Sequence, residues 1–194
     1  MPSYNLITKP VKKPVADEGL GDLAGHATVL VITEAKSVLE NSIRIIKKLL
    51  ETHDSGLCIT VNQPYSTMKR ILEKEGVKDG KIFFIDCISM AAGGLPQKTE
   101  DCLYVTSPAA LTEIGISMTH ALEALKGKNK FVFIDSLGTF LIYNSAGTMS
   151  KFNHFMVTKI SLMGINGVFM LVEREMDEKL LSELQSFCEK TVKL

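Results

Sequence analysis

The stretch "FVFIDSLGTF", Phe131–Phe140, is the part of the sequence that says most about the fold. Its apolar run ends at Asp135 and Ser136, which is typical of a buried strand that brings a carboxylate to the edge of a sheet. The runs "TVLVIT" at Thr28–Thr33 and "KIFFID" at Lys81–Asp86 are almost as continuous. Strands of this kind belong to parallel sheets, because helices cover both faces of such sheets. The sequence therefore predicts a three-layer α/β fold with a mainly parallel sheet.

Short apolar runs alternate with helical patterns from residue 28 onward, as expected for a sheet with crossover helices. The predicted strands are Thr28–Thr33, Leu57–Val61, Ile82–Asp86, Lys130–Asp135 and Gly167–Val172, with a sixth beginning at Thr191. The predicted amphipathic helices are Lys36–Glu51, Leu111–Leu125, Lys151–Met163 and Asp177–Cys188. Ligands of such sheets bind at the carboxyl ends of the strands, so the positions of interest are Thr33, Asn62, Asp86, Asp135 and Glu173.

The composition excludes several classes of function. The 194 residues contain 22 basic and 22 acidic side chains, so no net charge draws the protein to nucleic acid, and binding of nucleic acid is not expected. No run reaches the roughly 18 apolar residues of a membrane span, which predicts a cytoplasmic protein without membrane contact. The four histidines lack the spacing of a metal site, and none is predicted. The cysteines Cys58, Cys87, Cys102 and Cys188 are scattered, which predicts reduced thiols in the core.

The domain organisation predicted from the sequence is simple. Residues 1–18 contain three prolines together with Lys9, Lys12 and Lys13, which is typical of an extended or disordered arm. Residues 19–194 have the length and apolar content of a single domain with one substantial core.

Over Gly19–Leu194 the order of elements resembles the RecA/KaiC-like ATPases. "KFVFIDSLGTF" looks like the Walker B strand of that family, and "GLCITVNQPYSTMKRILEKEGV" looks like its second strand and helix. "MGINGVFMLVERE" looks like a late strand entered through a glycine turn. "YVTSPAALTEIGISM" resembles archaeal RecA-fold domains of unassigned function found among signalling proteins. The resemblance implies a RecA-like fold, and an ATP site with magnesium where the motifs are intact.

The phosphate-binding motif of that family is missing. GxxxxGK[ST] uses glycines to wrap the phosphates, a lysine to neutralise them and a hydroxyl to hold magnesium. The corresponding segment is "ITEAKSVLENS", without glycine from Thr28 to Ser55. Thr33 and Val38 then occupy the glycine positions, Leu39 the lysine position and Glu40 the hydroxyl position. The alternative is a shortened loop that uses Lys36 and Ser37 beside Glu34. The favoured reading makes Ser37 a helix cap, with Glu40 completing a capping box.

The catalytic carboxylates are also missing. Where the family carries two glutamates this chain has Asn62 and Gln63, and an amide cannot act as a general base. Asp135 is then expected to cap the next helix or bond Ser136, or else to join Asp86, Glu34 and Glu40 in an acidic cleft for a cation or a basic ligand group.

Two further segments are of interest. Residues 89–101 are predicted to form a long loop that serves as a surface loop, a lid or an interface. Phe152 and Phe155 follow Asp135 in a segment that also contains Tyr143 and His154, and their helical spacing predicts core positions for both phenylalanines.

These observations favour a non-catalytic RecA/KaiC-like pseudo-ATPase that acts as a regulatory or protein-interaction module, with a protein partner or self-association as a homo-oligomer and without a cofactor. The alternative is an atypical nucleotide-binding protein or weak ATPase that uses Lys36, Ser37 and Asp135 with ATP and magnesium. The sequence does not identify a small-molecule ligand.

Overall fold

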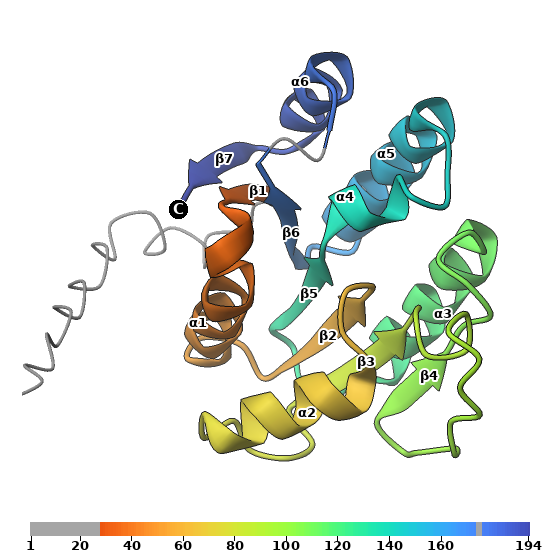
Figure 1. Cartoon of the computed structure of the whole chain (residues 1–194). Helices are drawn as coiled ribbons and strands as arrows, with labels where there is room; N and C mark the ends of the chain where they lie inside the picture. Colours follow the sequence, from red (N-terminus) through yellow and green to blue (C-terminus); the bar gives the residue numbers. More distant parts are fainter. Residues whose placement is uncertain (1–27, 174–175) are drawn as a thin grey trace, which may run out of the picture.

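The computed structural model describes residues 28–173 and 176–194 (Figure 1). Within these residues a parallel sheet is formed by β1 Thr28–Thr33, β2 Ser55–Thr60, β3 Ile82–Asp86, β4 Cys102–Tyr104, β5 Lys130–Asp135, β6 Asn166–Val172 and β7 Lys190–Lys193. The strand order is β4-β3-β2-β5-β6-β1-β7, and every pairing is parallel. The predicted three-layer α/β class is confirmed. The predicted arm, residues 1–18, lies outside the described residues.

Helices cover both faces of the sheet (Figure 1). Helices α1 Val38–Leu50 and α2 Tyr65–Lys74 pack on one face, over side chains such as Phe131 and Met170. The other face of the sheet, with side chains such as Ile134 and Phe169, is covered by four helices. These are α3 Leu111–Ala124, α4 Leu137–Phe140, α5 Ala146–Leu162 and α6 Glu178–Phe187. Successive side chains of a strand point to opposite faces, so one apolar run such as Phe131–Ile134 supplies both core layers. No helix among the described residues is long and apolar enough to cross a membrane.

Strands β1, β3 and β5 have the predicted bounds, whereas β2 begins two residues earlier than Leu57 and ends at Thr60. The reason is Gly56, which pairs with Phe131 of β5. A Cβ atom at Gly56 would lie 2.1 Å from the tip of the Phe131 ring, so the strand contains a residue that does not look strand-like in the sequence. Strand β4 was not predicted. Helix α5 begins five residues earlier than expected, because Ser145 accepts a hydrogen bond from the Thr148 N–H at 3.3 Å and caps it.

The cysteines occupy the predicted environment. All four are free thiols and all are buried. Burial raises the pKa of the Cys58 and Cys87 thiols well above the ordinary value, so both remain protonated at neutral pH. A protonated, enclosed thiol is a poor nucleophile, and the cysteines therefore serve as core side chains.

The edge strand β4 is tied to α2 through the carboxylate of Asp101. The Tyr65 hydroxyl donates to Asp101 Oδ1 at 2.5 Å, and Lys69 Nζ donates to Asp101 Oδ2 at 2.6 Å. Burial alone would raise the pKa of Asp101, but the hydrogen bonds from Lys69 and Tyr65 outweigh it and hold the pKa below its ordinary value. The ionised carboxylate therefore stabilises the folded state.

This contact predicts a pH-dependent loss in Asp101→Asn. A carboxyl group with a lowered folded pKa contributes stability above its unfolded pKa, about 3.9, and loses it as the pH falls through the folded pKa. At pH 7 we expect a loss of about 1–2 kcal/mol in the free energy of unfolding, and the difference from wild type should shrink below about pH 4. Urea unfolding at a series of pH values measures it. Asp79→Asn is the control, since Asp79 also contacts Lys69, at 3.2 Å, but is 75% exposed. A loss that does not change with pH would contradict the role of the charge.

Candidate functional site

The connection from β1 to α1 consists of Glu34 and one 3-10 turn. Strand β1 ends at Thr33, Glu34 follows, and a 3-10 turn η2, Ala35–Ser37, leads directly into α1. Thr33 is buried, and its Oγ1 accepts a hydrogen bond from Asn41 Nδ2 at 2.7 Å, which fixes the first turns of α1 against the strand. The position that the resemblance gives to the first glycine therefore has a structural role.

Lys36 and Ser37 lie in the 3-10 turn η2. The Lys36 ammonium contacts the Glu34 carboxylate at 2.5 Å, with both side chains largely exposed. The hydrogen bond and the negative charge of Glu34 raise the pKa of Lys36. The predicted capping box at Ser37 is wrong: its side chain makes no cap hydrogen bond. Its N–H donates to the Glu34 carbonyl at 2.9 Å, so Ser37 has helical backbone angles instead of the extended ones that a capping side chain needs.

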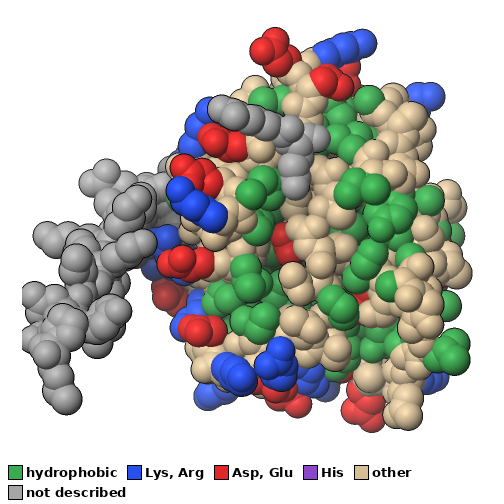
Figure 2. All heavy atoms as spheres, in the orientation of Figure 1, with side chains coloured by type: hydrophobic (Ala, Val, Ile, Leu, Met, Phe, Trp, Pro, Cys, Tyr) green, Lys and Arg blue, Asp and Glu red, His purple; other side chains and the backbone are tan. Residues whose placement is uncertain are grey.

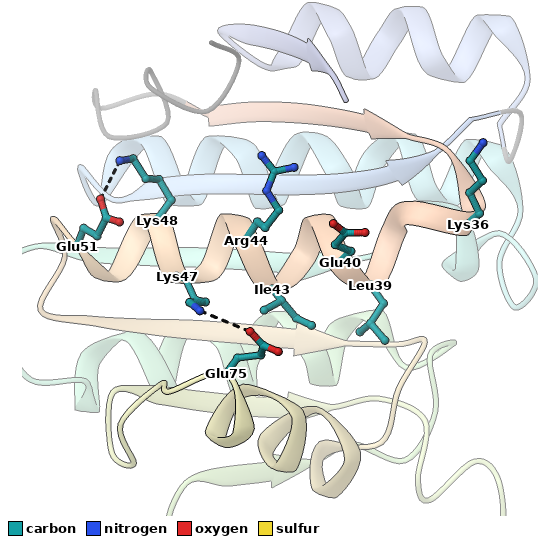
Figure 3. A pocket seen from close by; sticks show the side chains of 9 residues that line it. All are labelled: Lys36, Leu39, Glu40, Ile43, Arg44, Lys47, Lys48, Glu51 and Glu75. Carbon is teal, nitrogen blue, oxygen red and sulfur yellow. Dashed lines mark hydrogen bonds and ion pairs between the residues drawn. The ribbon is translucent and has the colours of Figure 1, made fainter. Parts of the chain in front are cut away.

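Leu39 and Glu40 lie on an open groove of about 710 Å³ along α1, together with Lys36 (Figure 3). The other side chains that line it are Ile43, Arg44, Lys47, Lys48, Glu51 and Glu75. Lys47 pairs with Glu75 at 3.5 Å and Lys48 with Glu51 at 2.8 Å, while Lys36 projects from the opposite end of the helix (Figure 3). Because these charges neutralise one another in pairs, the groove does not concentrate positive charge for a polyphosphate.

The carboxyl ends of β2 and β5 carry a hydrogen-bonded polar site. Asp135 is 3% exposed, and its Oδ1 accepts a hydrogen bond from Asn62 Nδ2 at 3.3 Å. Thr139 of α4 donates its hydroxyl proton to Asn62 Oδ1. Asn62 thus bridges the end of β5 and helix α4: its NH₂ group donates to one acceptor, and its carbonyl oxygen accepts from one donor. Ser136, joined to Asp135 by a cis peptide bond, is fully buried, and the Gln63 carbonyl accepts from the Thr60 hydroxyl.

Asp86, at the end of β3, is a carboxylate that accepts four hydrogen bonds at this edge of the sheet. It is fully buried, and Oδ2 accepts from the Tyr65 N–H at 2.8 Å and the Ser89 hydroxyl at 2.6 Å. Oδ1 accepts from the N–H groups of Ile88 and Ser89, both at 2.9 Å. Asp86 therefore fixes the first residue of α2 and the start of the loop after β3. Its position at a strand end was the only signal in the sequence, and the signal did not reveal this role.

The predicted acidic cleft does not form. Strand β6 separates β1, which leads to Glu34, from β5, which carries Asp135, and β2 separates β5 from β3 with Asp86. Among the described residues no three His, Cys, Asp or Glu side chains are placed to hold a metal ion. Glu173 follows β6 and donates its N–H to the Thr33 carbonyl at 2.8 Å, which aligns the ends of β6 and β1.

Of the two phenylalanines predicted to lie in the core, only Phe152 does. Phe152 is 7% exposed, whereas Phe155 is 46% exposed. Phe155 lies on the side of α5 that faces α3, and among the described residues it stays half exposed there. The predicted loop over residues 89–101 is present between β3 and β4.

Comparisons with known proteins agree with this architecture. The uncharacterized protein PH0321 from Pyrococcus horikoshii, solved in complex with an unknown peptide, superposes with a TM-score of 0.64 at 14% identity, over 91% of this chain and 80% of that one. The KaiC-like protein PH0186 from Pyrococcus horikoshii OT3 gives a TM-score of 0.64 at 14% identity, over 87% and 72%. PH0250 from the same organism gives a TM-score of 0.60 at 12% identity, over 87% of this chain and 81% of that one.

At these identities the likeness concerns the fold, which is of the RecA/KaiC-like type. No curated protein matches the chain. A family model described as a family of unknown function, DUF7504, matches residues 27–194. Since this match covers most of the sequence, the chain belongs to the DUF7504 family.

Proposed function

We propose that the protein is a RecA/KaiC-like domain that does not hydrolyse nucleotide and acts as a protein-interaction module with a regulatory role. The observation that carries the proposal is the bridge from Asp135 through Asn62 to Thr139. In this arrangement an amide that cannot accept a proton near neutral pH stands beside the acidic strand end, so Asn62 is not suited to activate a water molecule.

The β1–α1 connection supports the same conclusion. Glu34 alone separates the strand from η2, and its carboxylate is paired with Lys36. A triphosphate at this point would meet a carboxylate before it met backbone N–H groups, and like charges at such distances repel. PH0321, which has a similar fold, was solved with a bound peptide. This supports the proposal that the present protein also binds a protein partner.

Nucleotide binding is measured by a thermal-shift titration with ATP, ADP and GTP, with and without magnesium. A ligand that binds only the folded state at a hundredfold excess over its dissociation constant stabilises it by about 2.7 kcal/mol. We expect no shift at millimolar nucleotide and no ATP turnover above background. Lys36→Ala and Asp135→Asn are measured beside Lys47→Ala, which removes a lysine of α1 that pairs with Glu75.

The alternative, an atypical nucleotide-binding protein, makes the opposite prediction for the same variants. A shift in wild type that Lys36→Ala removes and Lys47→Ala retains would establish the short loop as a binding site. Turnover of ATP that Asp135→Asn abolishes would overturn the proposed function.

A further inference from the structure

An apolar groove lies between α3 and α5, on the face of the sheet opposite α1. It encloses about 540 Å³. It is lined by Leu111, Thr112, Gly115, Ile116, Thr119 and His120 of α3 and by Thr148, Lys151, Phe152 and Phe155 of α5. Ile116 is 53% exposed and Phe155 is 46% exposed, although both are large apolar side chains. Where α4 and the start of α5 lie, the surface shows more hydrophobic and fewer charged side chains than over α1 and α2 (Figure 2).

The groove exists because α3 and α5 are spaced differently from α5 and α6. Helix α5 packs closely on α6, where the His154 ring meets the Phe187 ring with centroids 4.9 Å apart. Toward α3 the contact is made by the Phe155 ring, which lies against Gly115. A Cβ atom at Gly115 would be 3.0 Å from that ring, so the missing side chain lets the ring lie across the gap with one side uncovered. The result is two apolar walls, Ile116 and Phe155, that face solvent.

The one formally charged residue that lines the groove is a lysine. None of the ten lining residues is acidic, and Lys151 is exposed within the groove. Within the part of the chain that the structure describes, Lys151 has no ion-pair partner. Glu113 lines the adjoining pocket instead. There its Oε2 accepts hydrogen bonds from the Thr106 N–H at 3.1 Å and the Thr106 hydroxyl at 2.6 Å. An occupant that brings a carboxylate beside apolar side chains would complement this surface.

We infer that the α3–α5 groove binds a short amphipathic segment of a protein partner, with apolar side chains on one face and an Asp or Glu placed to meet Lys151. This inference rests on the proposed function, because it assigns the surface through which the module acts. The α3 wall runs from Leu111 to His120, about 14 Å at 1.5 Å per residue, which accommodates two to three turns of helix. Apolar side chains spaced three and four residues apart would fill such a groove.

Two other occupants fit less well. Small-molecule sites enclose most of their ligand, whereas the walls of this groove are half exposed. A second copy of the chain related by a two-fold axis would place the same surface on both sides, so Lys151 would face a groove that also lacks a carboxylate. The charge distribution therefore favours a different, acidic partner segment.

The test is a selection of twelve-residue peptides from a displayed random library on the full-length protein, followed by fluorescence anisotropy with the enriched peptides. Enriched sequences are expected to carry apolar residues at helical spacing and at least one Asp or Glu. Phe155→Ala and Ile116→Glu are each expected to weaken binding by at least about tenfold, as for truncation of a central anchor. Lys151→Glu should weaken it by a similar factor, and raising the salt concentration should weaken wild-type binding.

Matched controls lie on the same helix. Leu162→Ala removes an apolar side chain of α5 that is 82% exposed but outside the groove, and Lys159→Glu reverses a charge outside it. Both should bind as wild type does. Circular dichroism of each variant checks that it is folded, which is expected because Ile116, Lys151 and Phe155 are exposed.

Each other outcome overturns the inference. Failure to enrich any peptide excludes this kind of occupant, and peptides that bind the groove variants unchanged assign the interaction to another surface while the proposed function stands. A dimer in light scattering that Ile116→Glu converts to monomer assigns the groove to a second copy. A selected consensus that matches residues 1–27 assigns it to the chain's own N-terminal segment. Nucleotide turnover is measured separately, so the proposed function can fail while the groove still binds.

Discussion

Asp86→Ala is expected to lower the free energy of unfolding by about 3–4 kcal/mol, because the substitution leaves several donors without an acceptor. The carboxylate accepts from the Tyr65 N–H, which is buried, and from the half-buried N–H groups of Ile88 and Ser89. Alanine offers none of them an acceptor and removes a negative charge from the start of α2, where the helix dipole favours one. Urea denaturation of wild type and variant measures the loss.

The size of the loss can be apportioned with two further variants. Ser89→Ala removes one of the four hydrogen bonds, at 2.6 Å, and should cost about 1 kcal/mol. Asp86→Asn keeps one oxygen but turns an NH₂ group toward one pair of donors, so an intermediate loss is expected. Asp79→Ala removes an exposed carboxylate in the turn between α2 and β3, and should change the free energy of unfolding by less than about 0.5 kcal/mol. A loss below about 1 kcal/mol for Asp86→Ala would show that water replaces the carboxylate without cost.

Asp86 also illustrates where sequence reasoning stops. Strands β1, β3 and β5 were predicted to the residue because each is a run of apolar side chains that ends in a polar one. Asp86 accepts hydrogen bonds mainly from backbone N–H groups, and one of these groups lies 21 residues away in the sequence. No pattern of side chains can predict such bonds. Strand β4 was missed for a related reason. It has three residues, and its register depends on the Phe84 N–H donating to the Asp101 carbonyl at 2.8 Å.

The environment of Phe155 depends on the spacing between helices, which hydrophobic periodicity does not encode. Periodicity distinguishes the inner and outer faces of a helix, and it placed Phe152 correctly. Whether the flank of α5 is covered depends on how closely α3 approaches. That approach is set by a glycine, Gly115, on a different helix. The candidate groove could therefore not be derived from the sequence of either helix alone.

Asn62 and Asp135 were both identified as site positions through the family resemblance, but their contact was not predicted. The resemblance to RecA/KaiC-like ATPases implied amides where that family has glutamates, and the sheet order places β2 beside β5. The sequence did not show that Asn62 contacts Asp135, nor that Thr139 holds its other end. The second contact depends on α4, a helix of four residues that no periodic pattern can indicate.

Asn62→Asp is expected to destabilise the protein by about 2–4 kcal/mol at pH 7. The substitution keeps the shape of the side chain but replaces the Nδ2 donor, 3.3 Å from Asp135 Oδ1, with an oxygen. Two ionised carboxylates at that distance repel by about 5 kcal/mol at an effective dielectric constant of 20. Sharing a proton relieves part of this, which raises the pKa of the pair above that of an ordinary aspartate. The loss should therefore be largest near neutral pH and shrink below about pH 5.

Asn62→Ala is the matched control for Asn62→Asp, because it removes the hydrogen bonds without adding a charge. Its loss should be smaller, about 1–2 kcal/mol, and independent of pH between about 5 and 8. Equal losses for both variants at every pH would contradict an electrostatic role for the amide. Magnesium is titrated in the same experiment, since a divalent cation between two carboxylates would offset their repulsion. Millimolar magnesium should leave Asn62→Asp as unstable as before; recovery would mean that a cation can enter between β2 and β5 once both carry a carboxylate.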